Sequence, residues 1–311
     1  MARDALAITG PTAVGKTELA LRIAERTGAE IVSVDSRQVY RGLDIGTAKP
    51  TPAERARVPH HGIDVVDPGT RYSAGRFARD ARRWVGEIRS RGRVPLLVGG
   101  TGFFLRALLE PLFEEPPLDP DRRRRLERVL ARMEGERRFR WLDALDPESA
   151  AQLRRGGGRQ RELRTLEVAL LTGHSLGWWH RERPAREPGL DALIFVLDRP
   201  RQALDRRIDA RVEAMLRAGF LEEVAGLIDA GYGPDDPGMS ATGYSEAIAA
   251  LDGQLSVDDA ADRIRRMTRR YARRQLTWFR NQLPPDARWL DGTRPMDELV
   301  EEVVEQWRNE V

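Results

Sequence analysis

The chain has 311 residues, 41% of them hydrophobic, which is enough for a large packed domain and too much for a disordered chain. Cysteine is absent, so disulfides and thiolate metal sites are excluded. The net charge of +3 points to no class of partner. Only Lys16 and Lys49 are lysines among the 52 Lys and Arg residues, which fits a need for lysine itself at both positions.

The chain begins Met1-Ala2-Arg3-Asp4 and then enters an apolar segment, without the basic start, apolar stretch and cleavage site of a secretory signal. It contains no run of about 18 apolar residues, so no membrane span is expected. These features predict a cytoplasmic protein.

Apolar strands alternate with amphipathic helices in the N-terminal third of the chain. Leu6–Thr9 is the first predicted strand, and a Gly-rich loop and the helix Lys16–Arg26 follow it. Ile31–Val34 is a second strand with Asp35 at its carboxyl end, and Val94–Val98 is a third. This order is typical of an α/β fold, in which helices cover both faces of a parallel sheet.

The pattern changes after Pro111. Residues 113–190 contain several Arg-rich helices and no convincing strand, and Ala192–Leu197 is then a buried strand again. We therefore predict a core of residues 1–112 and 191–311 that is interrupted by an all-helical insertion of residues 113–190. The longest predicted helix runs from Ser256 to Asn281. Its apolar stripe consists of Val257, Ala260, Ala261, Ile264, Met267, Tyr271 and Trp278.

A phosphate-binding loop lies between the first strand and the first helix. Its residues are Gly10, Pro11, Thr12, Ala13, Val14, Gly15, Lys16 and Thr17, which match G-x-x-x-x-G-K-[ST] in the required context. The glycines let backbone N–H groups turn toward an anion, and the helix N-terminus adds partial positive charge. Lys16 is placed to neutralise a phosphate, and the Thr17 hydroxyl is placed to bind Mg²⁺.

This loop does not fix the reaction. ATPases and GTPases usually hold Mg²⁺ with an Asp at the end of another apolar strand, but the strand Val94–Val98 ends in Gly-Gly-Thr. The nearest acidic candidate is Asp35. The equipment for nucleotide hydrolysis is therefore incomplete, and a diphosphate that departs as a leaving group fits the loop as well as a phosphoryl donor does.

The long C-terminal helix is strongly basic over half its length. No acidic residue occurs from Arg263 to Arg280, and arginine stands at positions 263, 265, 266, 269, 270, 273, 274 and 280. Exposed helices normally interleave both signs, because like charges one turn apart repel. This pattern favours binding of nucleic-acid phosphates, although acidic side chains from distant segments are an alternative source of neutralisation.

Further segments carry a resemblance to a known family. They are Asp35-Ser-Arg-Gln-Val-Tyr-Arg-Gly-Leu-Asp-Ile-Gly-Thr-Ala-Lys-Pro50, Pro59-His-His61, Tyr72-Ser-Ala74, Leu97-Val-Gly-Gly-Thr-Gly102 and Tyr271-Ala-Arg-Arg-Gln-Leu-Thr-Trp-Phe-Arg280. Together with residues 10–17 they resemble the bacterial tRNA dimethylallyltransferase family, in the expected order over nearly the whole chain.

The resemblance implies an enzyme that transfers a dimethylallyl group from dimethylallyl diphosphate to N6 of adenosine 37, in the anticodon stem-loop of tRNA. It implies that the loop of residues 10–17, together with Arg211, holds the diphosphate with Mg²⁺, and that no ATP is consumed. We expect a monomer with no membrane partner.

Two residues gain catalytic roles from the resemblance. Asp35 matches the family aspartate that binds N6 of the adenine and acts as general base, whereas taken alone it is equally a turn cap. Thr101 matches a threonine whose hydroxyl bonds the bridging oxygen of the diphosphate, whereas taken alone it is a helix cap. The adenine must leave the stacked anticodon loop to reach a buried base.

The resemblance also implies contacts with tRNA. The residues are Asp35, Ser36, Arg37, Gln38, Thr101, Arg123, Gln160, Arg161, Glu162, Leu163, Arg164, Arg270 and Arg274. Three positions depart from the family pattern. Phe104 lacks the hydroxyl of the usual tyrosine, and Ser240 and Ser245 stand where basic residues are common, so two cationic contacts are missing.

Three alternatives stay open. A P-loop kinase of a small metabolite would bind and consume ATP. A prenyltransferase for free adenine nucleotides would need neither the insertion nor the Arg-rich helix. A non-catalytic RNA-binding module would not need Asp35 and Thr101 beside a phosphate loop.

Overall fold

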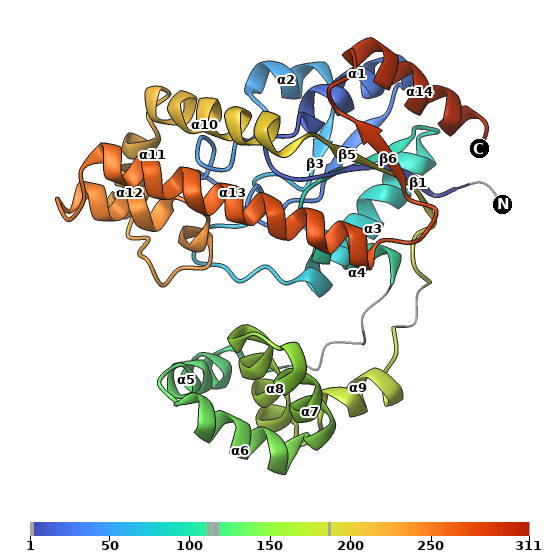
Figure 1. Cartoon of the computed structure of the whole chain (residues 1–311). Coiled ribbons are helices and arrows are strands. Elements are labelled where there is room, and N and C mark those ends of the chain that lie inside the picture. The colour runs from blue at the N-terminus through green and yellow to red at the C-terminus, as the bar shows by residue number, and fades with distance from the viewer. Residues whose placement is uncertain (1–2, 111–112, 114–117, 186–187, 311) are drawn as a thin grey trace. The chain divides into compact units, whose positions relative to one another are not determined.

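The computed structural model describes residues 3–110, 113, 118–185 and 188–310, and in these residues six parallel strands form one sheet (Figure 1). The strand order is β3-β2-β4-β1-β5-β6. The strands are β1 (Ala5–Thr9), β2 (Glu30–Ser33), β3 (His60–His61), β4 (Pro95–Gly99), β5 (Ala192–Asp198) and β6 (Arg288–Asp291). The predicted α/β class with a parallel sheet is therefore confirmed.

The chain folds into two compact units, the first formed by residues 1–109 and 189–311 and the second by residues 110–188. These limits lie within a few residues of the boundaries expected for a core and an insertion. The helices of the first unit are α1 (Lys16–Thr27), α2 (Pro52–Arg57), α3 (Ala74–Ser90), α4 (Gly102–Leu109), α10 (Arg201–Arg217), α11 (Phe220–Asp229), α12 (Tyr244–Leu251), α13 (Val257–Gln282) and α14 (Met296–Arg308).

Alternate residues of the strands face opposite layers of helices. Leu6 and Ile8 of β1 pack in one apolar cluster with Leu96 of β4, Phe195 of β5 and residues of α1 and α14. The intervening strand residues are buried as well, and α3 contacts β2 and β4. Figure 1 shows α1 with α14, and α3 with α4, on opposite sides of the sheet. Burial on both faces explains why these strands are continuous apolar runs.

Two features of the first unit differ from expectation. Strand β6 was not predicted, because Arg288 and Asp291 give it a polar composition and only Leu290 is buried. The apolar stripe expected on α13 is partly wrong: Val257 and Met267 are exposed, whereas Gln275 is buried. A polar residue on the buried face of a helix marks a side chain with a specific hydrogen-bonding partner.

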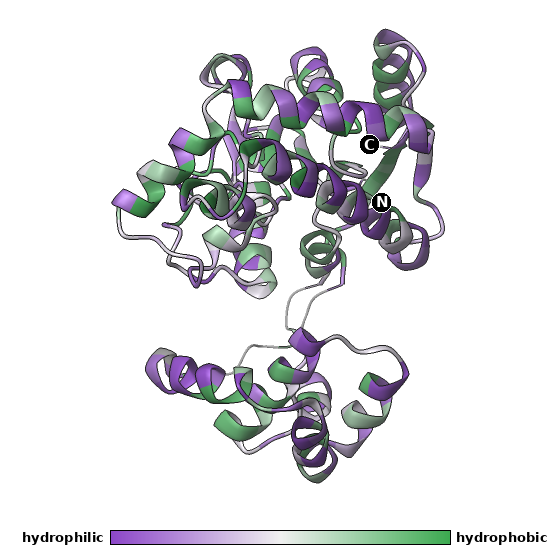
Figure 2. Cartoon of the chain, turned by 60° about the vertical axis from the view of Figure 1, so that its left-hand side comes forward, coloured by the Kyte–Doolittle hydropathy of each residue, from purple (hydrophilic) through white to green (hydrophobic). Residues whose placement is uncertain are grey.

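The second unit is helical in all its regular elements among the described residues. They are α5 (Pro120–Ala131), α6 (Gly135–Leu145), α7 (Pro147–Gly156), α8 (Arg159–Thr172) and α9 (Leu176–Glu182). Leu130, Leu142, Ala150, Leu153 and Leu166 form its own small apolar core. In Figure 2, hydrophilic and hydrophobic residues alternate along the helices, as expected where each helix covers a core on one face.

Across the described ranges of the chain, no helix combines the length and the apolar character that a membrane crossing requires.

Candidate active site

The carboxyl ends of four adjacent strands meet at one edge of the sheet. Thr9 of β1 pairs with Gly99 of β4 and with Val196 of β5, and Ser33 of β2 pairs with Val98 of β4. The segments that follow these strands therefore lie side by side, as at the ligand-binding edge of other parallel sheets. They are the phosphate loop, Asp35 with its neighbours, the Gly99-Gly100-Thr101 segment and the start of α10.

The phosphate loop depends on backbone conformations that glycine adopts easily. Gly10 has φ 145° and Gly15 has φ 114°. A Cβ on Gly10 would lie 2.3 Å from the carbonyl oxygen of Leu197, so no other residue fits there. The Lys16 ammonium donates to the carbonyl oxygens of Gly10 at 3.0 Å and Pro11 at 2.8 Å.

Lys16 lies in an environment that disfavours its charge. Burial is the main reason why its pKa falls to about 8; the nearby Asp35 carboxylate opposes this fall and the Arg211 guanidinium adds to it. A bound anion would compensate the ammonium. The loop is therefore built to hold a negatively charged group.

Three arginines surround the loop from the side of β5 and α10. Arg211 donates to the Thr12 hydroxyl at 3.1 Å, and burial lowers the pKa of its guanidinium. Arg207 donates to the Ala13 carbonyl at 2.8 Å, and Arg199 donates to the Val14 carbonyl at 2.9 Å. Arg211 was predicted as a diphosphate ligand. The other two were missed, although Arg207 lies one turn before Arg211 on the same helix.

Asp35 has one of the two roles considered for it, because it caps a turn, and its role as general base stays a prediction. Its Oδ1 accepts a hydrogen bond from the Arg37 backbone N–H at 2.8 Å, so the side chain caps a turn. No described residue donates to Oδ2. Asp35 lines the same cleft as Lys16 and Thr17, so the second oxygen is available to a substrate in that cleft.

Thr101 lies between the ends of β2 and β4. Its hydroxyl oxygen accepts from the Ser36 backbone N–H at 3.0 Å, and its backbone N–H donates to Val34. The side chain interacts with Tyr271 of α13, a residue that lines the cleft. Burial and the negative charge of Asp35 raise the pKa of Tyr271 to about 12, so its phenol stays protonated.

Gln275, one turn beyond Tyr271, was missed by the sequence analysis. Its amide oxygen accepts from the Thr12 N–H at 2.9 Å and its amide nitrogen donates to the Gly100 carbonyl at 2.7 Å. A Cβ on Gly100 would lie 2.5 Å from that nitrogen. Gln275 thus joins α13 to the loops after β1 and β4. The only sequence signal was a polar residue in a buried position of a helix.

The cleft enclosed by these segments has a cavity volume of about 120 Å³ and is partly open to solvent. Thr12, Lys16, Thr17 and Arg211 line its phosphate-binding end. Apolar side chains are also among its lining, namely those of Ala20, Ile31, Ala48, Pro50 and Val98. A lining of both kinds suits a molecule with a charged head and a short apolar tail.

The arginines of α13 fall into two groups. Arg265 pairs with Asp262 and Glu213, Arg269 pairs with Asp209, and Arg280 pairs with Asp198. No ion pair with a described residue is present at the other five, which are Arg263, Arg266, Arg270, Arg273 and Arg274. Distant acids therefore neutralise part of the basic stretch, and the remainder is left for a polyanion.

The predicted RNA-binding residues of the second unit differ in their exposure to solvent. Gln160 and Arg161 at the start of α8 are exposed. Glu162 is buried and accepts from Arg138 at 2.9 Å, and Leu163 packs against the apolar core. Contact of either residue with RNA stays a prediction.

Arg123 and Arg164 of the second unit share one acidic partner. Their guanidinium groups lie 2.5 and 2.6 Å from the buried Glu167 carboxylate. Contact of either arginine with RNA stays a prediction.

The three departures from the family pattern have distinct settings. Phe104 is buried and stacks on Phe77 with 4.4 Å between ring centroids, so a hydroxyl is replaced by apolar packing. Ser240 accepts from the Arg37 guanidinium at 2.9 Å and so orients a cation near Asp35. Ser245 is exposed and bonds Glu246.

A site for Mg²⁺ made by the protein alone is absent from the described residues, where no three His, Asp or Glu side chains are grouped for a metal. Mg²⁺ often keeps several waters and binds through one or two protein oxygens together with substrate phosphates. Thr17 supplies such an oxygen in the cleft beside Lys16. The residues present fit a metal that is bound together with a diphosphate.

Comparisons with known proteins show which family the chain resembles. A family model described as "IPP transferase" matches residues 38–282, and one described as "Isopentenyl transferase" matches residues 3–59. The tRNA dimethylallyltransferase of Halorhodospira halophila is 50% identical over 286 residues, which cover 91% of each chain.

Solved structures are similar over nearly the whole chain. The tRNA isopentenylpyrophosphate transferase of Bacillus halodurans has a TM-score of 0.71 and 36% identity, and the match covers 98% of this chain and 95% of that one. A eukaryotic dimethylallyltransferase acting on tRNA has a TM-score of 0.78 and 27% identity, with 99% of this chain and 76% of that one covered.

Proposed function

Because the chain belongs to the IPP transferase family, in which its relatives are tRNA dimethylallyltransferases, we propose that it transfers a dimethylallyl group from dimethylallyl diphosphate to N6 of adenosine 37 in tRNA. One observation carries the proposal. The phosphate loop, Arg211 and Asp35 line a single cleft that also has an apolar part. The cleft thus offers an anion site, a base and room for a short apolar group together.

The reaction follows from these groups. The adenine N6 lone pair attacks C1 of the allylic donor, the C1–O bond breaks, and its electron pair leaves on the ester oxygen, which becomes a terminal oxygen of diphosphate. Lys16, Arg211 and the loop N–H groups stabilise this departing charge. The free oxygen of Asp35 takes the N6 proton as the bond forms, because a neutral exocyclic amine is a weak nucleophile. The hydroxyls of Thr101 and Tyr271 lie close to Asp35.

Mg²⁺, when bound, would neutralise charge on the diphosphate oxygens, and the Thr17 hydroxyl is the protein oxygen that would hold it. Lys16 and Arg211 lie at the phosphate loop whether or not Mg²⁺ is bound. The alternative function, a P-loop kinase of a small metabolite, has less support. No carboxylate follows β4 at Gly99-Gly100-Thr101 to complete a nucleotide-hydrolysis site.

The tRNA substrate would lie along the unpaired arginines of α13, with Arg37 and the exposed start of α8 as further contacts. Adenosine 37 must be flipped out of the anticodon loop, since Asp35 lies within a cleft. The enzyme acts as a monomer in the cytoplasm.

The direct test is incubation with radiolabelled dimethylallyl diphosphate, Mg²⁺ and unmodified tRNA that has adenosine at position 37. We expect label in the tRNA, at one adenosine, and equal release of diphosphate. A tRNA with guanosine at that position is the control. ATP turnover without label transfer would overturn the proposal in favour of a kinase.

Replacement of both Arg270 and Arg274 with Gln is expected to weaken tRNA binding. Each lost phosphate contact should reduce the slope of log K against log salt concentration by about 1, so the double variant should lose about 2. KM for dimethylallyl diphosphate should stay within about twofold, because neither side chain lines the cleft. Filter binding of tRNA from low to high salt gives the slope.

The matched control replaces Arg265 and Arg280 with Gln. Both lie on the same helix as Arg270 and Arg274, but they pair with acidic side chains. This control removes the same formal charge but should change the slope less than the first variant does. Equal slopes for the two double variants would show that total charge, and not the unpaired stretch, binds the RNA.

A further inference from the structure

The segment Leu43–Pro50 forms one wall of the cleft. Thr47, Ala48 and Pro50 line it, and Ala48 and Pro50 are two of its apolar lining residues. The segment is not a helix or strand, and Ala48 has φ 47°, a conformation that costs a non-glycine residue energy. A wall of this kind keeps its shape only where other groups fix it.

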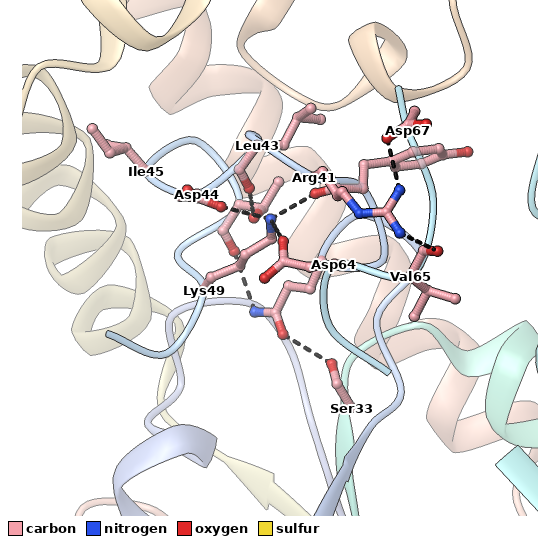
Figure 3. A network of polar contacts seen from close by, with 12 residues as sticks. Ser33, Arg41, Leu43, Asp44, Ile45, Lys49, Asp64, Val65 and Asp67 are labelled. Atoms are coloured by element: carbon pink, nitrogen blue, oxygen red, sulfur yellow. Dashed lines mark hydrogen bonds and ion pairs between the residues drawn. The ribbon is translucent and has the colours of Figure 1, made fainter. Parts of the chain in front are cut away.

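Lys49 fixes the segment from one side (Figure 3). Its ammonium donates at 2.6 Å to each of three oxygens, from the Tyr40 carbonyl, the Asp44 carboxylate and the Asp64 carboxylate. The side chain is only 4% exposed. Lys49 also lowers the pKa of Asp64 against the effect of burial, which keeps that carboxylate charged at neutral pH.

The geometry explains why this position is lysine in a chain that otherwise uses arginine almost everywhere. Three oxygens around one nitrogen match the three N–H bonds of an ammonium group. A planar guanidinium carries its donors in a flat fork on three nitrogens and cannot reproduce that arrangement. Lys16 and Lys49, the two lysines of the chain, are thus both placed where a compact cation is required.

Glu223 of α11 fixes the same segment from the other side. Its carboxylate accepts from the backbone N–H groups of Asp44, Ile45 and Gly46, at 2.8, 2.5 and 3.1 Å. The Tyr244 hydroxyl donates to the same carboxylate at 2.6 Å. A Cβ on Gly46 would lie 2.4 Å from the Phe220 ring, so the contact between segment and helix is close.

Gln38 connects this fixed segment to the sheet. Its amide nitrogen donates to the Ala48 carbonyl at 3.2 Å, and its amide oxygen accepts from the Ser33 hydroxyl at 2.9 Å. Both Gln38 and Ser33 line the cleft. Ala48 is therefore tied to β2 by a hydrogen-bonded chain through Gln38, and it is the residue next to Lys49 in the sequence.

We propose that Lys49 and Glu223 are positioning residues that set the wall of the donor pocket and thereby its selectivity for the length of the allylic tail. This inference rests on the proposed function, since it takes the apolar part of the cleft as the site of the tail. Neither residue lines the cleft, so both act through Ala48 and Pro50.

The experiment compares wild type with Lys49→Met and Lys49→Arg in calorimetric binding of two ligands without tRNA. Dimethylallyl diphosphate reports on head and tail, and inorganic pyrophosphate reports on the phosphate loop alone. We expect both variants to bind dimethylallyl diphosphate about tenfold or more weakly, because a small displacement of a positioning wall is costly, and to bind pyrophosphate within about twofold of wild type.

The same variants should discriminate less between dimethylallyl and geranyl diphosphate in transfer to tRNA, because a loosened wall admits the longer tail. Glu223→Gln should change the selectivity in the same direction, and it keeps the inference testable if Lys49→Met does not fold. The matched control is Arg41→Gln, which removes an exposed ion pair with Asp67 in the same region but no contact to Leu43–Pro50.

A lower melting temperature with unchanged relative affinities and unchanged tail selectivity would overturn the inference, since Lys49 would then serve only stability. Failure of the proposed function gives a different result: wild type would bind pyrophosphate but would show no preference for the allylic diphosphate and no transfer.

Discussion

Replacing Asp35 with Asn should lower the rate of dimethylallyl transfer by about a thousandfold, within the range that a positioned general base contributes. The amide cannot take the N6 proton, although it has nearly the shape of the carboxylate. The affinity for dimethylallyl diphosphate should stay within a few fold, because the phosphate loop and Arg211 hold the head group. Single-turnover assays at saturating tRNA measure the chemical step, and calorimetry measures donor binding.

The choice of Asn over Ala separates two roles of one side chain. Asn keeps an oxygen that can accept from the Arg37 N–H, the bond that Asp35 makes at 2.8 Å, and so keeps the turn. Ala removes both the turn cap and the base. A nearly active Asn variant beside an inactive Ala variant would assign Asp35 to the turn alone and leave the base to be sought elsewhere.

The main elements of the site could be predicted because their signals are local. A Gly-rich loop between a strand and a helix specifies its own conformation, and a carboxylate after a buried strand must lie at the ligand-binding edge of a parallel sheet. The positions of Lys16, Thr17 and Asp35 in one cleft follow from these two rules and from the strand order β2-β4-β1.

Interactions between distant segments could not be predicted in the same way. Gln275 reaches Thr12 across 263 positions of sequence, and Arg199 reaches Val14 across 185. No pattern near either residue shows its partner. The pairing of α13 arginines is similar, because Asp209 of α10 neutralises Arg269 while Arg270 next to it stays free of ion pairs with described residues.

Burial gives the second reason for incomplete prediction. A sequence motif assigns Glu162 and Leu163 to an RNA-binding segment, but the helical period turns both toward the interior of the second unit. Neighbouring residues of one motif therefore serve different purposes, with Gln160 and Arg161 exposed and Glu162 held by Arg138.

The phosphate loop and the segment Leu43–Pro50 each contain one lysine, but the charges of these two lysines are compensated in different ways. Lys49 has its three oxygens supplied by the protein, so its role is complete before substrate binds. Lys16 donates only to two backbone carbonyls of its own loop and lies beside another cation, Arg211. The Asp35 carboxylate compensates the charge of Lys16 only in part, so a bound anion would supply the rest.

Replacing Lys16 with Met should therefore weaken binding of dimethylallyl diphosphate and of pyrophosphate by about a hundredfold, because charge-assisted hydrogen bonds to a phosphate are lost inside a partly enclosed site. Calorimetry with each ligand measures this loss. Lys16→Arg should recover little, since the larger planar group does not fit beneath a phosphate in the loop. Similar losses for both ligands would place Lys16 at the head group and away from the tail.

The pH dependence of the same binding gives an independent check, because burial lowers the pKa of Lys16 to about 8. The ligand-free wild type loses this charge as pH rises through 8, so its advantage over Lys16→Met in pyrophosphate affinity should shrink between pH 7 and pH 10. Folding stability should change in the opposite direction. Below pH 8 the folded chain carries the buried charge of Lys16. Between pH 8 and the ordinary lysine pKa, the unfolded chain binds more protons at this residue than the folded chain does. The free energy of unfolding of the ligand-free protein should therefore rise with pH in this range. The titration of pyrophosphate itself is common to both proteins and cancels in the comparison. An affinity advantage that stays constant over this pH range would show that Lys16 keeps its charge, and the account of an incompletely compensated ammonium would be wrong.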